Sequence, residues 1–425
     1  MGKTSTEKIL TRTCGREVTP GEIVYPDPDL VVLTDLQLYH GSTSITDDLR
    51  ALGVASMPQP GKYMVTLSHA VPVTSNKGAE IVKGIRRAVA ELGIENFFDE
   101  GCHGIEHSIP IEKGLARPGM LVFGGDTHAS TMGAVGALGI PLPYEFLTVL
   151  ATGTAWIRVP QTIRIELVSS FPEGVLSKDL ILWIISDIGA ERANYRVLEF
   201  FGPGVKTIGV EGRMTLCNVP VQIGAKSAIV EPDEKTVVYV KSRTAQPFEV
   251  VKSDPDADFE QAFQYDLSHL EPMVAMPPNP DNVRPVTALA GTKIHQVSLG
   301  ACPNGMLEDL RIAAQVLKGH RIRSGVRFIV CPATQQVFLE AVREGLIEIF
   351  LSAGATITEP GCSICLGTIA PLAAGESCIS TITRNEPGRL GSAEADIYLA
   401  SPATLAASAI KGEITDPREF LQGRR

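Results

Sequence analysis

The sequence predicts an α/β fold built on doubly wound parallel sheets. Short apolar runs at 29–34, 64–67 and 120–123 each stop at a polar, Gly-rich loop that leads toward a helical stretch. This alternation is typical of parallel strands joined by helices. Between the second and third runs, residues 76–92 repeat apolar side chains at helical spacing. Because such sheets bind ligands at the carboxyl ends of their strands, the loops after these runs are the first place to look for a site.

The remaining elements follow in chain order. A fourth strand is expected at 96–99, and the small residues at 130–139 predict tight helix packing. We interpret the alternating run at 162–167 as an edge strand that opens a second domain, and the acidic, Pro-rich stretch at 253–284 as a linker or surface crossing. Further elements are expected as helices at 179–189, 309–317 and 335–344 and strands at 296–299 and 326–330. The domain boundaries predicted from these elements are 1–161, 162–278 and 279–425.

Composition excludes several classes of function. The 425 residues carry a formal net charge of −10 and no basic block, so an electrostatic groove for nucleic acid has no support. The apolar run at 180–185 is far too short to cross a membrane. Eight scattered cysteines in so long a chain do not form a disulfide framework, which indicates a reducing cytoplasm. We interpret most of them as packed or surface thiols, namely Cys14, Cys102, Cys217, Cys331 and Cys378.

The other three cysteines lie on turns framed by Gly and Pro. Cys362 and Cys365 belong to the stretch Glu359–Gly367, and Cys302 lies 60 positions before Cys362 (362 − 302). Three thiolates can hold three irons of a cubane cluster and leave the fourth iron open as a Lewis acid. A zinc knuckle, a redox pair or unliganded core cysteines would show the same spacing. Spacing alone therefore leaves these alternatives open.

Histidines and arginines supply a second group of candidates. His69, His107 and His128 lie in loops after predicted strands, and Asp126 lies two residues before His128. Asp–His pairs suit proton transfer because the carboxylate fixes the tautomer and stabilises the imidazolium. Arg384 and Arg389 share a turn, and arginine forks bind carboxylates with paired hydrogen bonds. The alternative is that these are surface side chains without a functional role.

Together these motifs resemble the large subunit of an aconitase-family hydro-lyase, as a divergent member of the 3-isopropylmalate dehydratase and homoaconitase type. The resemblance covers almost the whole chain, and its motifs are Gly104–His107, Gly125–His128, Cys217–Asn218 and Gly361–Gly367. It implies three domains of α/β/α layers around a central cleft. Similar enzymes reversibly dehydrate a hydroxy-dicarboxylate or hydroxy-tricarboxylate.

The resemblance also implies roles for particular residues. Cys302, Cys362 and Cys365 would ligate a [4Fe–4S] cluster. The catalytic group would consist of His69, His107, Asp126 and His128. Substrate would be bound by Thr127, Asn218, Arg384 and Arg389. In the family the carbon-proton base is a serine on a swivelling domain, and this chain ends before such a domain, so a small subunit carrying it is the expected partner.

Five positions depart from the family pattern. Ser68, Thr127, Gln222, Pro303 and the pair Thr383/Glu386 stand where the family usually has Asp, Ser, Glu, Thr and Asn/Phe. Losing carboxylates at 68 and 222 is expected to leave His69 and His128 without acidic partners, so that only His107 keeps one, Asp126. Glu386 adds negative charge beside Arg384.

These departures predict a changed substrate, such as an alkyl-malate or alkyl-maleate, or a changed proton route. Two other hypotheses stay open. The chain could be a catalytically silent paralogue that serves as a scaffold or regulatory subunit. It could also be an RNA-binding apo-protein, although its acidic charge argues against that.

Overall fold

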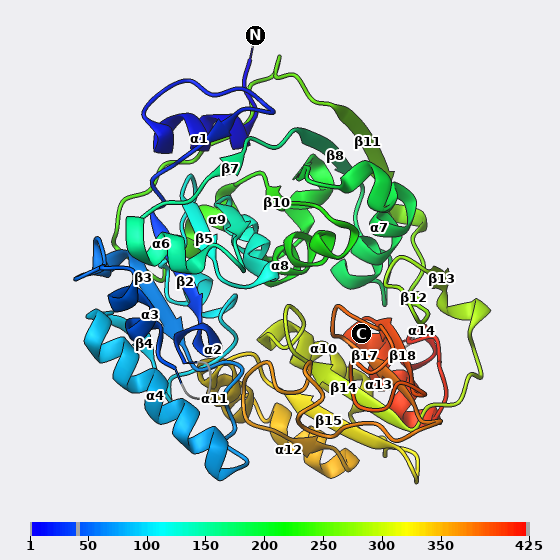
Figure 1. Cartoon of the computed structure of the whole chain (residues 1–425). Helices are drawn as coiled ribbons and strands as arrows, with labels where there is room; N and C mark the ends of the chain where they lie inside the picture. Colours follow the sequence, from blue (N-terminus) through cyan, green and yellow to red (C-terminus); the bar gives the residue numbers. More distant parts are fainter. Residues whose placement is uncertain (1, 40–42, 422–425) are drawn as a thin grey trace. The chain divides into compact units, whose positions relative to one another are not determined.

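The structure, a computed structural model, describes residues 2–39 and 43–421 (Figure 1). The chain divides into two compact units, Met1–Leu167 with Arg192–Tyr265, and Val168–Glu191 with Asp266–Arg425. The predicted α/β class is confirmed, because helices alternate with strands in three main sheets. The predicted three-domain boundaries stay a prediction.

The first unit contains a five-stranded parallel sheet in the order β4-β3-β2-β5-β6. Its strands are β2 (Leu30–Thr34), β3 (Tyr63–Thr66), β4 (Asn96–Phe98), β5 (Leu121–Gly124) and β6 (Leu138–Pro141). The sequences Leu-Val-Val-Leu of β2 and Leu-Val-Phe-Gly of β5 are buried throughout, as expected of central parallel strands covered on both faces. Strand β6 was missed by the sequence analysis.

Helices cover this sheet and bound the loops that follow its strands. The longest is α4 (Asn76–Leu92), which begins where the Ser75 side chain accepts a hydrogen bond from the Gly78 N–H and ends at Gly93, whose φ is 67°. The predicted apolar stripe is confirmed, since Val82, Ile85 and Val89 are buried. The unit's other α-helices are α1 (Ser5–Cys14), α2 (Asp35–Leu38), α3 (Ile45–Ala51), α5 (Ile109–Glu112), α6 (Phe146–Thr152), α8 (Val210–Asn218) and α9 (Glu234–Lys241).

Its second large sheet has the order β10-β9-β8-β11. The strands are β8 (Thr162–Val168), β9 (Val197–Phe201), β10 (Ser227–Val230) and β11 (Gln261–Asp266). The prediction of an edge strand at 162–167 is wrong, because β8 lies between β9 and β11. A two-stranded pair joins β1 (Ile23–Val24) to β7 (Ile157–Arg158).

Small residues bring the 3₁₀ helix η2 (Thr127–Val135) close to this second sheet. A Cβ on Gly133 would overlap the carbonyl oxygen of Ala228 in β10, so the position requires glycine. This confirms tight packing of the small residues. However, the segment consists of η2 followed by β6 and is not a single α-helix. Two further 3₁₀ segments, η3 (Pro203–Thr207) and η4 (Val219–Ile223), flank α8.

The second unit is built on a seven-stranded sheet with the order β13-β12-β18-β17-β14-β15-β16. Its strands are β12 (Met273–Ala275), β13 (Val283–Pro285), β14 (Gln296–Gly300), β15 (Arg327–Cys331), β16 (Thr356–Ile357), β17 (Ser377–Ser380) and β18 (Asp396–Ala400). The five strands from β18 to β16 are parallel, and β12 pairs antiparallel with both β13 and β18. Its α-helices are α7 (Ser177–Ala193), α10 (Leu307–Leu317), α11 (Gln335–Arg343), α12 (Leu346–Ala353), α13 (Pro402–Lys411) and α14 (Arg418–Leu421).

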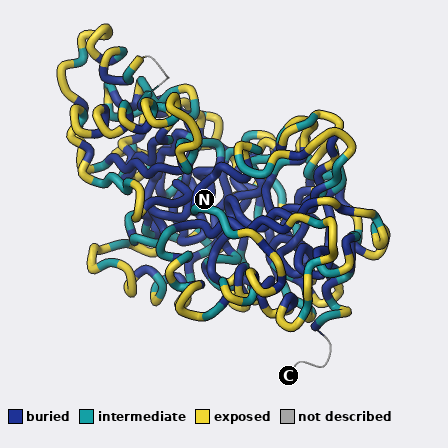
Figure 2. The backbone as a smooth tube through the Cα atoms, turned by 90° about the horizontal axis from the view of Figure 1, so that it is seen from below, coloured by how far each residue is buried: buried dark blue, intermediate teal, exposed yellow. Residues whose placement is uncertain are grey.

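The prediction of a linker at 253–284 needs correction. The segment contains β11, β12 and the start of β13, and the three residues of β12 are buried. Proline and acidic residues occupy the connections and hid these short strands. Figure 2 shows buried backbone (dark blue) in the interior and exposed turns (yellow) outside it.

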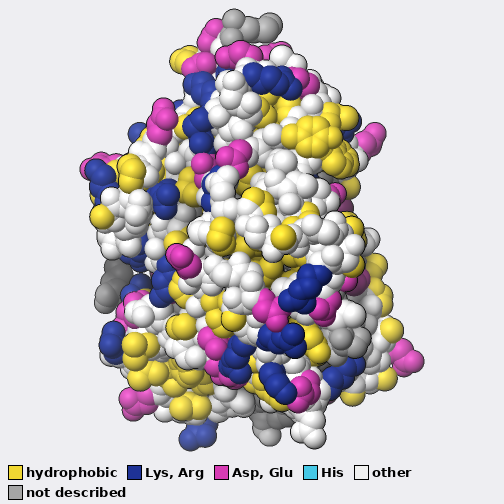
Figure 3. Space-filling model, turned by 60° about the vertical axis from the view of Figure 1, so that its left-hand side comes forward, with side chains coloured by type: hydrophobic (Ala, Val, Ile, Leu, Met, Phe, Trp, Pro, Cys, Tyr) yellow, Lys and Arg dark blue, Asp and Glu magenta, His cyan; other side chains and the backbone are white. Residues whose placement is uncertain are grey.

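The surface carries no block of basic side chains on the face shown in Figure 3, as the acidic composition predicts. On the face in Figure 3, basic and acidic side chains are interspersed and form no single-sign block. Among the helices of the described residues, none is long and apolar enough to cross a membrane.

Candidate functional site

In the first unit, four parallel strands end at one edge of the five-stranded sheet. The register pairs Thr34 with Thr66, Thr66 with Phe98, and Val32 with Gly124. The loops after β2, β3, β4 and β5 therefore meet at that edge. The loops carry His69, Glu106, His107 and Asp126, while Asp35 begins α2 and Thr127 and His128 begin η2 at the same edge.

His69 has a carboxylate partner that the sequence did not reveal. Asp35 Oδ1 lies 3.1 Å from His69 Nδ1, and Asp35 Oδ2 accepts hydrogen bonds from the backbone N–H groups of Ser68, His69 and Ala70. Asp35 is completely buried. Burial acts to raise its pKa, but the His69 interactions and the backbone donors hold the pKa below its ordinary value. The expectation that His69 lacks an acidic partner is wrong, because Asp35 supplies one from the neighbouring strand end.

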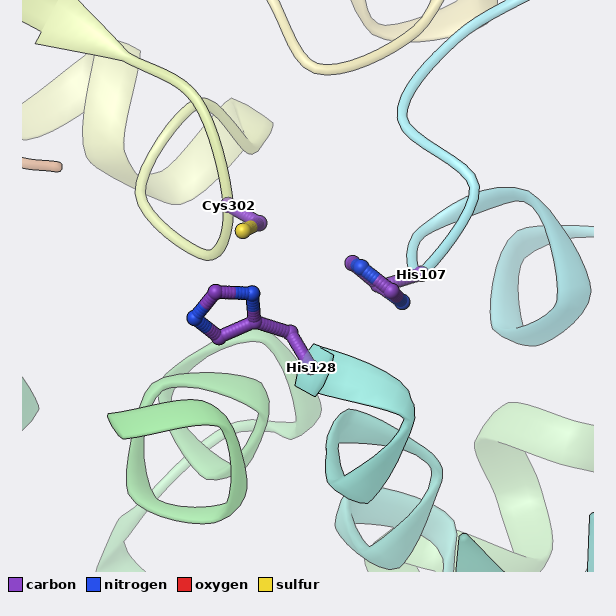
Figure 4. A group of neighbouring side chains, drawn as sticks. All are labelled: His107, His128 and Cys302. Atoms are coloured by element: carbon purple, nitrogen blue, oxygen red, sulfur yellow. The ribbon is translucent and has the colours of Figure 1, made fainter. Parts of the chain in front are cut away.

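Asp126 is shared by two histidines. Its Oδ1 lies 3.1 Å from His107 Nε2 and 3.1 Å from His128 Nδ1, and it accepts the His128 backbone N–H at 2.9 Å. Burial acts to raise the pKa of Asp126, but these histidines hold the pKa well below its ordinary value. The ring centroids of His107 and His128 are 5.8 Å apart, and Figure 4 shows the two rings on separate segments. The expectation that only His107 keeps a carboxylate is wrong, since Asp126 serves both.

Gln222 completes the environment of His128. Its Nε2 lies 2.7 Å from His128 Nε2. A carboxylate can only accept, so a proton on His128 Nδ1 faces Asp126 while His128 Nε2 accepts from the Gln222 amide. This pattern assigns His128 the tautomer with its proton on Nδ1. A glutamate at position 222 would favour the imidazolium.

Glu106 is a member of this group that the sequence analysis did not select. Its side chain is 1% exposed, and neither carboxylate oxygen has a hydrogen-bond partner among the residues the structure describes. One ligand-type atom from each of His69, Glu106 and Asp126 lies within 4.8 Å of the other two. Burial raises the pKa of Glu106 to about 7, against the opposing effect of His69 and His107. The one sequence signal was an acidic residue directly before a motif histidine.

The two predicted polar substrate contacts of this unit also lie near His128. Thr127 Oγ1 donates to Asp126 Oδ1 at 3.4 Å. Asn218 ends α8, four residues before Gln222, and is fully buried. Its Nδ2 donates to Thr131 Oγ1 at 2.8 Å, while its Oδ1 has no partner within the described part of the chain. That oxygen can accept a hydrogen bond from a ligand.

The second unit gathers its candidates at one edge of the seven-stranded sheet. The register pairs Gly300 with Cys331, Val330 with Ile357, and Ser298 with Ser380. The loops after β14, β16 and β17 therefore start from the same edge, and they carry Cys302, Cys362, Cys365, Arg384 and Arg389. The three cysteines are buried, and both arginines are half-buried. Both arginines are therefore partly shielded from solvent, and their role in binding substrate stays a prediction.

Cations accompany the cysteines of this edge. Arg389 Nη2 lies 3.0 Å from Cys365 Sγ. Burial acts to lower the pKa of Arg389, but Cys365 keeps the pKa above its ordinary value. Lys178, which the sequence analysis did not select, is buried in the first turn of α7, and burial lowers its pKa to about 8. Positive charge beside sulfur favours thiolates, the form that binds metals. The donor set therefore fits an iron–sulfur cluster.

The remaining cysteines behave as packed or surface thiols, as predicted. Cys331 ends β15 and donates through Sγ to the carbonyl oxygens of Glu359 and Gly361. Burial raises its pKa to about 11, which keeps it a neutral thiol. Cys217 and Cys378 are buried and Cys102 is exposed. All eight cysteines are free of disulfides.

Comparison with known proteins shows which protein family this chain resembles. Residues 7–412 match the aconitase family (aconitate hydratase). The 3-isopropylmalate dehydratase large subunit 1 of Methanopyrus kandleri is 44% identical over 423 residues, covering 99% of this chain and 100% of that protein. The corresponding protein of Pyrococcus furiosus is 42% identical over 99% of this chain and 100% of its own. A probable methanogen homoaconitase large subunit of Methanothermobacter thermautotrophicus is 42% identical over 97% of both chains.

A solved structure shows a more distant likeness. Aconitase X of Thermococcus kodakaraensis, in its holo-form, matches 87% of this chain and 84% of its own with a TM-score of 0.48. The sequence identity is 11%.

Proposed function

The chain belongs to the aconitase family and is a hydro-lyase large subunit of that family, and we propose that it reversibly dehydrates a small hydroxy-dicarboxylate. The observation that carries this proposal is the chemistry of the two sheet edges. One holds three buried cysteines with two half-buried arginines. The other holds three histidines served by buried or partly buried carboxylates.

Cys302, Cys362 and Cys365 would hold a [4Fe–4S] cluster, which supplies a Lewis-acidic iron for a substrate hydroxyl. Around that centre, the forks of Arg384 and Arg389 bind substrate carboxylates by paired hydrogen bonds. Two cations match two carboxylates, which favours a dicarboxylate.

In this proposal the histidines of the first unit, His69, His107 and His128, form the proton-transfer group. His107 and His128 share Asp126, so a proton on either ring faces the same oxygen. Asp35 orients His69 in the same way. A carboxylate behind a histidine stabilises the imidazolium that forms when the ring accepts a proton. His107, whose Nδ1 has no hydrogen-bond partner among the described residues, and His69 would give a proton to the departing hydroxyl and take it back on hydration.

The substrate we propose is an alkyl-substituted malate or maleate. Several relatives are named 3-isopropylmalate dehydratase, which supports a dicarboxylate with an apolar substituent. Gln222, which stands where the family usually has Glu, removes a negative charge beside His128. Glu386, two residues after Arg384, disfavours an additional substrate carboxylate there.

In this proposal a small subunit binds this chain and completes the enzyme. The enzyme acts in a reducing cytoplasm. The relatives are named large subunits, which supports a heteromer. We propose that the partner carries a swivelling domain whose serine removes the carbon-bound proton. The free cysteines support a reducing compartment.

The test is a substrate panel. The chain is reconstituted anaerobically with iron and sulfide, combined with its cognate small subunit, and assayed with 3-isopropylmalate, citrate, homocitrate and citraconate. We expect about four irons per chain and broad absorbance near 400 nm, with turnover of an alkyl-malate or maleate such as citraconate. Robust turnover of 3-isopropylmalate would contradict the change of substrate that the departures from the family pattern predict, although it would still fit the proposed class of alkyl-malates. A fully loaded protein that is silent on the whole panel would support a scaffold role, and one tightly held zinc would overturn the cluster.

A further inference from the structure

Glu106 is a buried carboxylate whose two oxygens are available to a ligand. Its side chain is 1% exposed, and within the described part of the chain neither oxygen has a hydrogen-bond partner. Oε1 lies 3.5 Å from His107 Nε2, but that nitrogen is closer to Asp126 Oδ1, at 3.1 Å, so a proton on it is directed to Asp126. A buried carboxylate is costly unless a proton or a cation compensates it. Glu106 is therefore suited to binding a cation.

Two other side chains that can bind a metal converge on Glu106. One ligand-type atom from each of His69, Glu106 and Asp126 lies within 4.8 Å of the other two. The three residues follow β3, β4 and β5, whose carboxyl ends share one edge of the five-stranded sheet. The side chain of Asp126 is 29% exposed, so an ion from solvent can reach the group although Glu106 is shielded.

The contact between His69 and Asp35 suits metal binding. Asp35 Oδ1 lies 3.1 Å from His69 Nδ1. Because a carboxylate accepts, the ring proton is on Nδ1 and the lone pair is on Nε2. Three backbone N–H groups hold the other oxygen of Asp35 in place. Metal-binding histidines usually donate their second ring N–H to a carboxylate in this way, which fixes the ring and raises its basicity.

Asp126 can bind an ion without losing its hydrogen bonds. Among the residues that the structure describes, the donors to Asp126 are His107, Thr127 and His128, and all of them contact Oδ1. The other oxygen, Oδ2, is therefore the one that can bind an ion. With Glu106, it supplies the two negative charges that a divalent cation requires.

We infer that His69, Glu106 and Asp126 form a binding site for a divalent transition-metal ion. One imidazole nitrogen and two carboxylate oxygens suit Mn²⁺, Fe²⁺ or Zn²⁺, whereas Mg²⁺ and Ca²⁺ prefer oxygen ligands alone. The site shares no residue with the three-cysteine centre. It can therefore be filled in a chain that holds no cluster, and the inference does not depend on the proposed function.

The test uses Mn²⁺ as the probe, because carboxylate and imidazole ligands suit this ion and soft thiolates do not. The metal-free, full-length chain is titrated anaerobically with Mn²⁺, and the bound ion is measured by electron paramagnetic resonance. Pulsed spectra of the bound ion detect a coordinated histidine nitrogen. Melting temperatures are recorded with and without Mn²⁺, since an ion that binds only the folded chain raises them.

The variants separate this site from other carboxylates and from the cysteines. Glu106→Gln and His69→Ala each remove one ligand. Glu199→Gln is the matched control, because Glu199 is also a buried carboxylate of the first unit but accepts hydrogen bonds from two serine hydroxyls. A further variant combines Cys302→Ser, Cys362→Ser and Cys365→Ser.

We expect the wild-type chain to bind a single Mn²⁺ with a histidine nitrogen and to melt at a higher temperature with the ion. Glu106→Gln and His69→Ala should bind Mn²⁺ about tenfold more weakly or worse. Glu199→Gln and the triple serine variant should bind it like the wild type.

Three results would overturn the inference. The first is a wild-type chain that binds no Mn²⁺ at millimolar concentration, or binds it without a histidine nitrogen. The second is equal affinity in Glu106→Gln and the wild type. The third is loss of binding in the folded triple serine variant, which would assign the ion to the cysteines. If Glu106→Gln and His69→Ala fail to fold, the nitrogen signal of the triple serine variant supports the site, and its absence refutes it.

Discussion

Asp35 Oδ1 lies 3.1 Å from His69 Nδ1, although the two residues are 34 positions apart and follow different strands. The contact exists because β2 and β3 are parallel neighbours with Thr34 opposite Thr66. It places a carboxylate behind His69 where the local sequence has only Ser68. This arrangement removes part of the support for a catalytically silent protein.

Replacing Asp35 tests whether it activates His69. Asp35→Asn would leave one amide oxygen to accept the backbone donors and remove the charge that stabilises a protonated His69. We expect kcat to fall by roughly 10²-fold, in the range for a general acid–base group. Steady-state kinetics measure this, with Asp47→Asn as the control because Asp47 is exposed and its side chain contacts only its own helix end in the described residues, through Arg50 and the Ser44 N–H. Equal kcat values for wild type and Asp35→Asn would show that the contact is structural.

Glu106 gives a pH-dependent stability with a definite sign. Its pKa is raised from 4.5 to about 7, so the folded state holds its proton more tightly than the unfolded state does. The stability this provides is complete below pH 4.5 and is lost as pH rises toward 7 and above. The 2.5-unit shift (7 − 4.5) amounts to about 3 kcal/mol by linkage.

Thermal melts of the metal-free chain between pH 4.5 and 8 check this effect. Glu106→Gln cannot ionise, so its melting temperature should rise relative to that of the wild type as pH increases. The difference between the two curves isolates Glu106, because every other titrating group is common to both. Parallel curves across this window would mean that Glu106 is not the group concerned.

Gln222→Glu should change the protonation of His128. A carboxylate at His128 Nε2 would replace an amide donor and favour the imidazolium. We expect the carboxylate to keep the His128 ring protonated to a higher pH than the amide does. An NMR titration of the His128 ring follows this directly. An unchanged His128 titration would be inconsistent with the observed contact.

Arg384→Lys should weaken substrate binding more than turnover. Lysine keeps the charge but not the planar fork that bonds both oxygens of a carboxylate. We expect KM to rise about tenfold or more, with a smaller change in kcat. Arg311→Lys is the control, because Arg311 is exposed and pairs with Glu344 on the surface. A KM equal to that of this control would remove Arg384 from the substrate site.

Cysteine substitutions separate ligands from packed thiols. We expect Cys302→Ser, Cys362→Ser and Cys365→Ser each to lose most of their iron and visible absorbance after reconstitution. Cys331→Ala should keep both, since burial holds that thiol neutral with its pKa at about 11. Iron analysis and absorbance spectra measure the outcome. Loss of iron in Cys331→Ala with a normal melting temperature would reassign the ligand set.

The sequence by itself determined the order of the main strands and helices. It also determined which loops carry the candidate site residues. Apolar runs such as 29–34 and 120–123 match β2 and β5 because buried parallel strands need continuous apolar residues. The motif residue Asp126 was found for the same reason, since it lies just after β5. His107 and Cys362 follow strands that are not fully buried, and they were found instead through their motifs, Gly104–His107 and the Cys-x-x-Cys turn. Short strands with mixed composition, such as β12 and β6, gave no comparable local signal.

Tertiary structure alone decided which groups face each other. The pairing of Asp35 with His69 and the sharing of Asp126 by His107 and His128 join residues from different loops. The burial of Glu106 and of Lys178 likewise depends on segments that are distant in the sequence. Their distances and charge states depend on strand register and on exclusion of water, which are set by packing across the whole sheet. A local sequence pattern carries no information about either, so these four features could be read only from the folded chain.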